Sequence, residues 1–139
     1  MSYTANLRRQ HDESIFRIKE IFTYLIPEYL KANAQQVRNL LSTFIGKANI
    51  HRATEDEYLY PKLLKHESPE LRNLAQKYYD GFISSKDVLG NYSTKWAAFS
   101  KIKENPNEFI DDTKMVLTKI LDRIDKENNE LFTLVDKLM

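Results

Sequence analysis

Residues 37–58 read VRNLLSTFIGKANIHRATEDEY, and the spacing of their apolar side chains decides the fold class. Apolar residues recur every three or four positions, which is the period of an amphipathic helix. The series continues through two ionisable residues without a break: Val37, Leu41, Phe44, Ala48, His51, Glu55 and Tyr58. We expect Asn33 to cap the start of this helix and Pro61 to kink or end it, because proline removes a backbone donor. His51 and Glu55 are therefore expected on the buried face of the helix.

Three further stretches share this helical period. They cover roughly 5–25, 68–99 and 105 to near the C-terminus. The first stretch ends before Pro27, because proline disfavours helix in the residue that precedes it. The remaining expected core positions are Leu7, His11, Ile15, Ile18, Phe22, Leu25, Leu71, Ala75, Tyr78, Phe82, Ser85, Leu89, Tyr92, Trp96, Phe99, Ile110, Val116, Ile120, Ile124, Glu127, Leu131, Leu134 and Leu138. Short connections make neighbouring helices antiparallel. The sequence thus predicts an all-α, antiparallel, up-down-up-down four-helix bundle.

Length and composition agree with this fold and exclude several classes of protein. The 139 residues suit one domain, so we expect a single bundle over 1–139. Three glycines and four prolines are too few for a sheet protein, which needs many turns. The net charge of +1 lacks the basic excess of a nucleic-acid binder. No apolar run approaches the ~20 residues that span a bilayer, and the N-terminus lacks an apolar signal region. We expect a cytoplasmic protein without nucleic-acid or membrane partners.

Four of the expected core positions carry ionisable side chains. They are His11, His51, Glu55 and Glu127. A buried carboxylate is costly unless it has a cationic partner, a metal or a proton. The spacing of four between His51 and Glu55 places both on one helix face, where they form either a surface pair or part of a metal site. The absence of cysteine excludes thiolate ligands and disulfides.

The depth of these residues in the bundle separates the two readings. Counting equal distances from the expected turns near Glu67 and Asn105 puts Glu127 at the level of His51 and Glu55. His11 lies within about two turns of the same layer. Two imidazoles and two carboxylates would then converge from three helices. Iron, manganese and zinc accept such nitrogen and oxygen ligands, and four protein ligands leave positions open for a small molecule.

Three segments resemble the motifs of hemerythrin-like (HHE cation-binding) proteins. They are residues 7–13, LRRQHDE; residues 51–61, HRATEDEYLYP; and residues 127–132, ENNELF. The resemblance implies a four-helix bundle that holds iron, with His11, His51, Glu55 and Glu127 as ligands. It also implies binding or sensing of dioxygen, nitric oxide or a redox ligand, or a part in iron handling, rather than an enzyme activity. The sequence does not identify a protein partner.

The chain departs from the family pattern at two positions. Members of the family typically hold two irons, but the fourth-helix histidine falls at Arg123 and the third-helix histidine falls at or beside Phe82. Neither residue ligates a metal, so the resemblance implies one iron ion, with manganese or zinc as substitutes. Arg123 would fill the vacated half and neutralise a glutamate, since guanidinium pairs bidentately with carboxylates. Tyr78 is assigned to the surroundings of the site, as a hydrogen-bonding group or as plain core.

Two alternatives stay open from the sequence. In one, the site is fully degenerate, the histidines and Arg123 merely satisfy buried glutamates, and the bundle is a metal-free protein-interaction module. In the other, which is the weaker, the open metal positions support oxidation chemistry.

Overall fold

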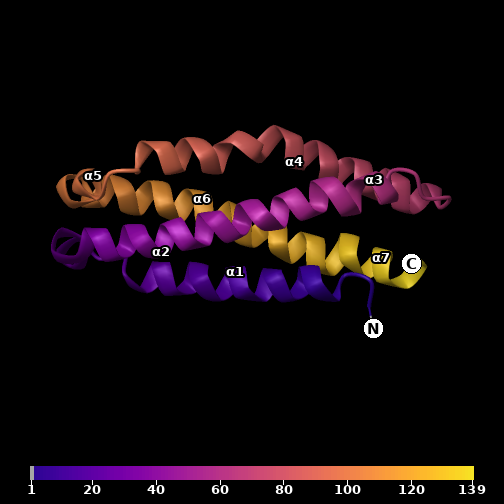
Figure 1. Cartoon of the computed structure of the whole chain (residues 1–139), viewed down its shortest axis with the longest axis horizontal. Coiled ribbons are helices and arrows are strands. Elements are labelled where there is room, and N and C mark those ends of the chain that lie inside the picture. Colours follow the sequence, from indigo (N-terminus) through magenta and orange to yellow (C-terminus); the bar gives the residue numbers. More distant parts are fainter. Residues whose placement is uncertain (1) are drawn as a thin grey trace.

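The computed structural model describes residues 2–139, apart from the side chain of Lys86. Long helices run along one axis in alternating directions, and both chain termini lie at the same end (Figure 1). In chain order the helices are α1 (Ala5–Thr23), α2 (Pro27–Thr54), the π-helix η1 (Glu55–Leu59), α3 (Tyr60–Leu63), α4 (Pro69–Lys95), α5 (Phe99–Glu104), α6 (Pro106–Lys126), the π-helix η2 (Glu127–Leu131) and α7 (Phe132–Leu138). The described residues contain no strand. The predicted all-α antiparallel bundle is confirmed.

One helix boundary differs from the prediction. α2 begins at Pro27, whose fixed φ suits the first turn of a helix, and not after Asn33. Asn33 instead breaks the helix internally, with φ −132° and ψ 30°, and its side chain donates to the carbonyl of Tyr29 at 3.2 Å. Asn33 is therefore a kink in a longer helix. The predicted start at Ser68 and Pro69 is confirmed, because the Ser68 hydroxyl accepts from the backbone N–H of Leu71 at 3.4 Å.

The register of the core shifts after Glu55 and again after Glu127. Each glutamate opens a π-helix, which inserts one residue into the turn. Tyr58 was expected in the core but is 60% exposed, and its neighbour Leu59 is buried instead. Leu138, also expected in the core, is 38% exposed for the same reason. Phe132 and Val135 take the buried positions of the final turns.

Phe99 is a further correction at the opposite end of the bundle. It was expected to extend the core face of the third helix, but it is 45% exposed. α4 ends before Trp96, and Phe99 begins the separate helix α5. Trp96 and Ile102 are fully buried there. The change of direction between α4 and α5 turns the Phe99 ring out to solvent.

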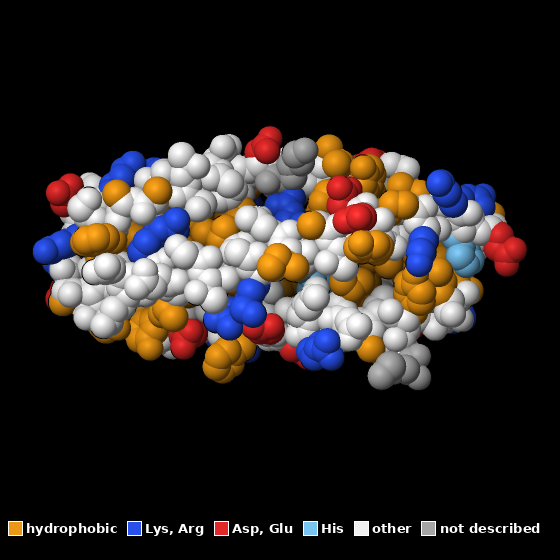
Figure 2. All heavy atoms as spheres, in the orientation of Figure 1, with side chains coloured by type: hydrophobic (Ala, Val, Ile, Leu, Met, Phe, Trp, Pro, Cys, Tyr) orange, Lys and Arg blue, Asp and Glu red, His pale blue; other side chains and the backbone are white. Residues whose placement is uncertain are grey.

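The apolar core consists of two clusters that lie on either side of a polar layer. The larger cluster includes Ile18, Leu41 and Trp96, and the smaller one includes Leu71 and Phe132. The only buried histidine and carboxylate side chains among the described residues belong to the layer between them: His11, His51, Glu55 and Glu127. On the face shown in Figure 2, basic and acidic side chains are interspersed among hydrophobic and polar ones.

Candidate metal centre

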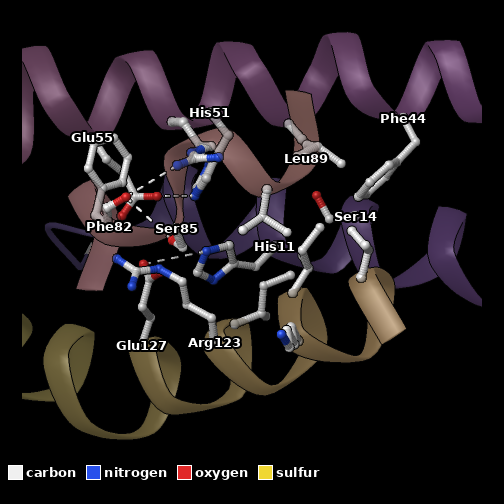
Figure 3. Close-up of a pocket in the computed structure, with 17 residues that line it drawn as sticks. His11, Ser14, Phe44, His51, Glu55, Phe82, Ser85, Leu89, Arg123 and Glu127 are labelled. Atoms are coloured by element: carbon white, nitrogen blue, oxygen red, sulfur yellow. Dashed lines mark hydrogen bonds and ion pairs between the residues drawn. The ribbon is translucent and has the colours of Figure 1, made fainter. Parts of the chain in front are cut away.

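Four buried side chains converge from three directions in the middle of the bundle. His11 comes from α1, His51 from α2, and the two glutamates Glu55 and Glu127 from the first residues of η1 and η2. One ligand atom of each lies within 4.8 Å of the others. Figure 3 shows these side chains pointing toward one another across the bundle. The structure therefore brings together all four residues that the sequence predicts as ligands.

The two π-turns position the carboxylates. An α-helix turns about 100° per residue, so one inserted residue changes which side chains face the core. In η1 the turn lets both Glu55 and Leu59 face inward, and in η2 it does so for Glu127 and Leu131. π-turns are rare, and they frequently occur at functional sites. Here the two lie opposite each other and each carries one carboxyl group of the cluster.

Two amide side chains orient the imidazoles. The Nδ1–H of His11 donates to Oδ1 of Asn128 at 2.7 Å. The Nδ1–H of His51 donates to Oε1 of Gln10 at 2.5 Å. Each ring is thereby protonated on Nδ1 and turns its unprotonated Nε2 toward a carboxyl group. A metal ion requires this tautomer, because it binds to the unprotonated nitrogen. The sequence prediction missed both amides, although each stands directly beside a candidate ligand.

Three atoms of the cluster are buried without a hydrogen-bond partner. They are Nε2 of His51, Oε2 of Glu55 and Oε2 of Glu127. Nε2 of His51 lies 2.7 Å from Oε1 of Glu55 but makes no directed hydrogen bond with it. Buried polar atoms are nearly always paired, and a cation between these three atoms would give each of them a partner. The donor set fits a metal ion that accepts nitrogen and oxygen ligands.

Burial shifts the protonation of the cluster. It lowers the pKa of both His11 and His51, so the imidazoles are neutral near neutral pH. Burial also raises the pKa of Glu55. For Glu127, burial together with the neighbouring Glu55 carboxyl raises the pKa to about 8. Without a cation, Glu127 is therefore mainly protonated near pH 7.

Arg123 lies beside the cluster, as the sequence predicts. Its Nε donates to Oε1 of Glu127 at 2.8 Å. Its Nη2 donates to the hydroxyl of Tyr60 and to the backbone carbonyl of Tyr78, both at 3.1 Å. Glu127 thus uses one oxygen for Arg123 and turns the other toward Nε2 of His11, 3.8 Å away. The guanidinium neutralises Glu127 on the side away from the imidazoles.

The other residues that the sequence places around the metal site have different roles. Phe82 is buried and lines the same pocket as Glu55 (Figure 3), with the Arg52 guanidinium 4.9 Å from its ring centre. Tyr78 contributes its carbonyl to Arg123, whereas its hydroxyl donates to Glu130 at 2.9 Å. Tyr60, which is fully buried, is a further residue that the prediction overlooked. Its position directly before Pro61, within the segment Leu59-Tyr60-Pro61, is the sequence feature that could have identified it.

The comparisons with known proteins agree with the site. Residues 3–135 match the family model of the hemerythrin HHE cation binding domain. No curated protein and no solved structure matches the chain significantly. Among the described helices, none has the length and apolar character that crossing a bilayer requires. With a match over nearly the whole chain and a histidine–glutamate cluster in the bundle, the protein belongs to the hemerythrin HHE cation-binding domain family.

Proposed function

We propose that this protein holds one iron ion through His11, His51, Glu55 and Glu127. The observation that carries the proposal is the set of three buried, unpartnered atoms in the cluster, on His51, Glu55 and Glu127. A cation bound there satisfies all three at once. Manganese and zinc accept the same donors and are the competing ions.

The proposal limits the site to a single ion because Arg123 already supplies a second positive charge. Oε1 of Glu127 is paired with the guanidinium and is not available to bridge two metals. Phe82, which lines the same pocket as the cluster, has no atom that can bind a metal. A guanidinium is permanently charged, so it remains a cation beside Glu127 at every physiological pH.

The proposed role is binding or sensing of dioxygen, nitric oxide or a redox ligand, or handling of iron. When bound, an iron ion with open coordination positions supplies diatomic-ligand binding and one-electron exchange. The chain itself keeps both imidazoles neutral, fixes their tautomers through Gln10 and Asn128, and surrounds the cluster with apolar side chains. Binding of a ligand accounts for these features without an enzyme activity.

Metal analysis of the protein purified without chelator tests the proposal. We expect close to one iron per chain, no retained metal in His51→Ala, and parent-level metal in His66→Ala. His66 is a matched control because it lies at the turn before α4, where its Nδ1 accepts from the backbone N–H of Ser68. A folded parent without metal would favour the metal-free interaction module. Metal retained in His51→Ala would refute the ligand assignment.

A spectroscopic titration then addresses the role. Addition of nitric oxide to the anaerobic iron protein should change its absorption spectrum, and the change should be absent in His51→Ala. An iron-containing parent whose spectrum does not respond to nitric oxide or dioxygen would leave iron handling as the role that the site supports.

A further inference from the structure

A cavity of about 140 Å³ begins at the polar cluster and continues along the bundle. In Figure 3, Glu55 and Arg123 lie at one end of the cavity, whereas Leu89 and Phe44 lie at the other. The lining between them is mostly apolar and comes from α2, α4 and α6. Val88 on α4 and Lys119 on α6 line the cavity and are exposed, so it reaches the surface between these two helices.

The size of the cavity exceeds the needs of a diatomic ligand. A cavity of ~150 Å³ lined by aliphatic and aromatic side chains stays dry and binds benzene. The cavity here has a similar volume but opens to the surface and is polar at one end, so its apolar part fits an organic group of up to about six carbon atoms. A gas molecule would leave most of the lining without contacts and would forfeit their dispersion energy.

The charges around the cavity favour an anionic ligand. Three cationic side chains line it: Arg52, Lys119 and Arg123. They outnumber the two carboxyl groups of the cluster, and a bound metal ion adds further positive charge. Opposite charges attract strongly where water is excluded, so a negative group on the ligand is stabilised and a positive one is repelled.

We propose that this cavity binds a short-chain carboxylic acid. Its carboxylate lies at the polar end beside Arg123, and its hydrocarbon chain lies between α2, α4 and α6 against Leu89 and Phe44. The metal ion supplies part of the positive charge at the polar end, so the carboxylate half of this inference rests on the proposed function. The hydrocarbon half depends only on the apolar cavity.

Calorimetric titration of the metal-containing protein with acetate, butyrate, hexanoate and octanoate tests the inference. Each added methylene should tighten binding about fourfold, the value of one buried CH₂, until the cavity is filled near hexanoate. Hexylamine, of equal length and opposite charge, should bind more weakly than hexanoate. Equal affinity for acetate and hexanoate, or tighter binding of hexylamine, would overturn the inference.

Variants of the lining separate the cavity from binding elsewhere. Ala48→Phe places a ring in the cavity from a half-buried position on α2. It should abolish the dependence on chain length and leave the metal content unchanged. Ala53→Phe makes the same substitution on the exposed face of that helix and should behave as the parent. Ile120→Ala enlarges the cavity and should shift the tightest binding to octanoate, which keeps the test decisive if Ala48→Phe does not fold. Parent-like titrations from both Ala48→Phe and Ile120→Ala would refute the site.

A separate measurement distinguishes failure of this inference from failure of the proposed function. If the purified protein takes up no metal, the proposed function has failed and the cavity is tested alone. Benzene should then raise the Tm of the metal-free parent and not that of Ala48→Phe. No effect of benzene on the parent would overturn the cavity as a ligand site.

Discussion

The guanidinium of Arg123 lies directly over Gly81 of the neighbouring helix. A Cβ atom at position 81 would stand 3.3 Å from Nη1 of Arg123, which is closer than most real contacts of a Cβ atom. Glycine in a helix costs about 0.5–1 kcal/mol relative to alanine, so its place here needs a reason. The missing side chain at Gly81 makes room for the cation that neutralises Glu127.

Gly81→Ala should therefore gain less stability than an alanine substitution elsewhere on α4. Gly90 is the matched control, because a Cβ atom there has nothing within 4 Å. Gly90→Ala should raise the free energy of unfolding by up to about 1 kcal/mol, whereas Gly81→Ala should gain little or lose stability. In an Arg123→Ala background the two substitutions should become equal. Equal gains in the parent, measured by urea unfolding, would show that the guanidinium is not held in place.

Arg123→Ala should destabilise the metal-free protein by up to about 3 kcal/mol above pH 8, where Glu127 is ionised, since it leaves a buried carboxylate without its cation. This is the low end for a broken buried pair, because the Arg123 side chain is 28% exposed. Lys114→Ala, an exposed position on the same helix, should cost under about 0.5 kcal/mol. A cost for Arg123→Ala that matches this control would mean that the arginine acts as a surface residue. Chemical denaturation of the three proteins decides the question.

Arg123→His combined with Phe82→His should rebuild a second metal position. The new imidazole at position 123 stands one turn before Glu127, and the one at position 82 replaces a ring that lines the same pocket as Glu55. We expect the double variant to approach two irons per chain. Arg123→His alone should bind the second ion weakly or not at all. An iron content in the double variant equal to that of the parent would contradict the view that these two positions account for the lost half-site.

Asn128→Leu should weaken metal binding about 10–100-fold, because the amide fixes the tautomer and orientation of His11. The neighbouring residue Asn129 provides the control, since its amide donates to Asp125 on the exposed face of the helix at 3.0 Å. Asn129→Leu should leave the affinity unchanged. Competition with a chromophoric chelator measures both constants. Equal affinities in the two variants would remove Asn128 from the site.

Metal uptake should release protons near neutral pH. Burial and Glu55 raise the pKa of Glu127 to about 8, so this group is mainly protonated at about pH 7 and must lose its proton to bind a metal. The neutral imidazoles release none. The apparent affinity should rise about tenfold per pH unit up to about pH 8 and then level off. Calorimetry in buffers of different ionisation enthalpy should give at least about one proton per ion, and a result independent of buffer would contradict the raised pKa.

The same shift has an effect on the metal-free protein with the opposite dependence on pH. The folded pKa of Glu127 lies above the ordinary glutamate value of 4.5, so the folded state binds a proton that the unfolded chain has released. This contribution to stability is complete below about pH 4.5 and is lost as the pH rises toward 8. Urea unfolding of the metal-free parent at several pH values should show this decline, and Glu127→Gln should reduce it.

Helical periodicity and depth counting predicted the bundle and the convergence of His11, His51, Glu55 and Glu127, because both depend on regular geometry. The register beyond the two glutamates was not predictable in this way. Pro61 indicates a break in the regular helix near η1, but η2 contains no proline or glycine. The parts of Gln10 and Asn128 were also hidden, since each amide supports a histidine on a different helix, 41 and 117 residues away along the chain.

Because of the two π-turns, the core-facing sides of two helices are rotated in one half of the bundle relative to the other half. Beyond the polar layer, the second and fourth helices have each rotated by one residue, about 100°, relative to an uninterrupted α-helix. Both rotations occur at the same depth, so the smaller apolar cluster forms between faces that have turned together. Deleting one residue from η1 alone would rotate Leu59 and Leu63 away from the cluster, whereas Phe132 and Val135 on α7 would keep their orientation. We therefore expect the two insertions to depend on each other, although Glu55 and Glu127 are 72 positions apart in the sequence.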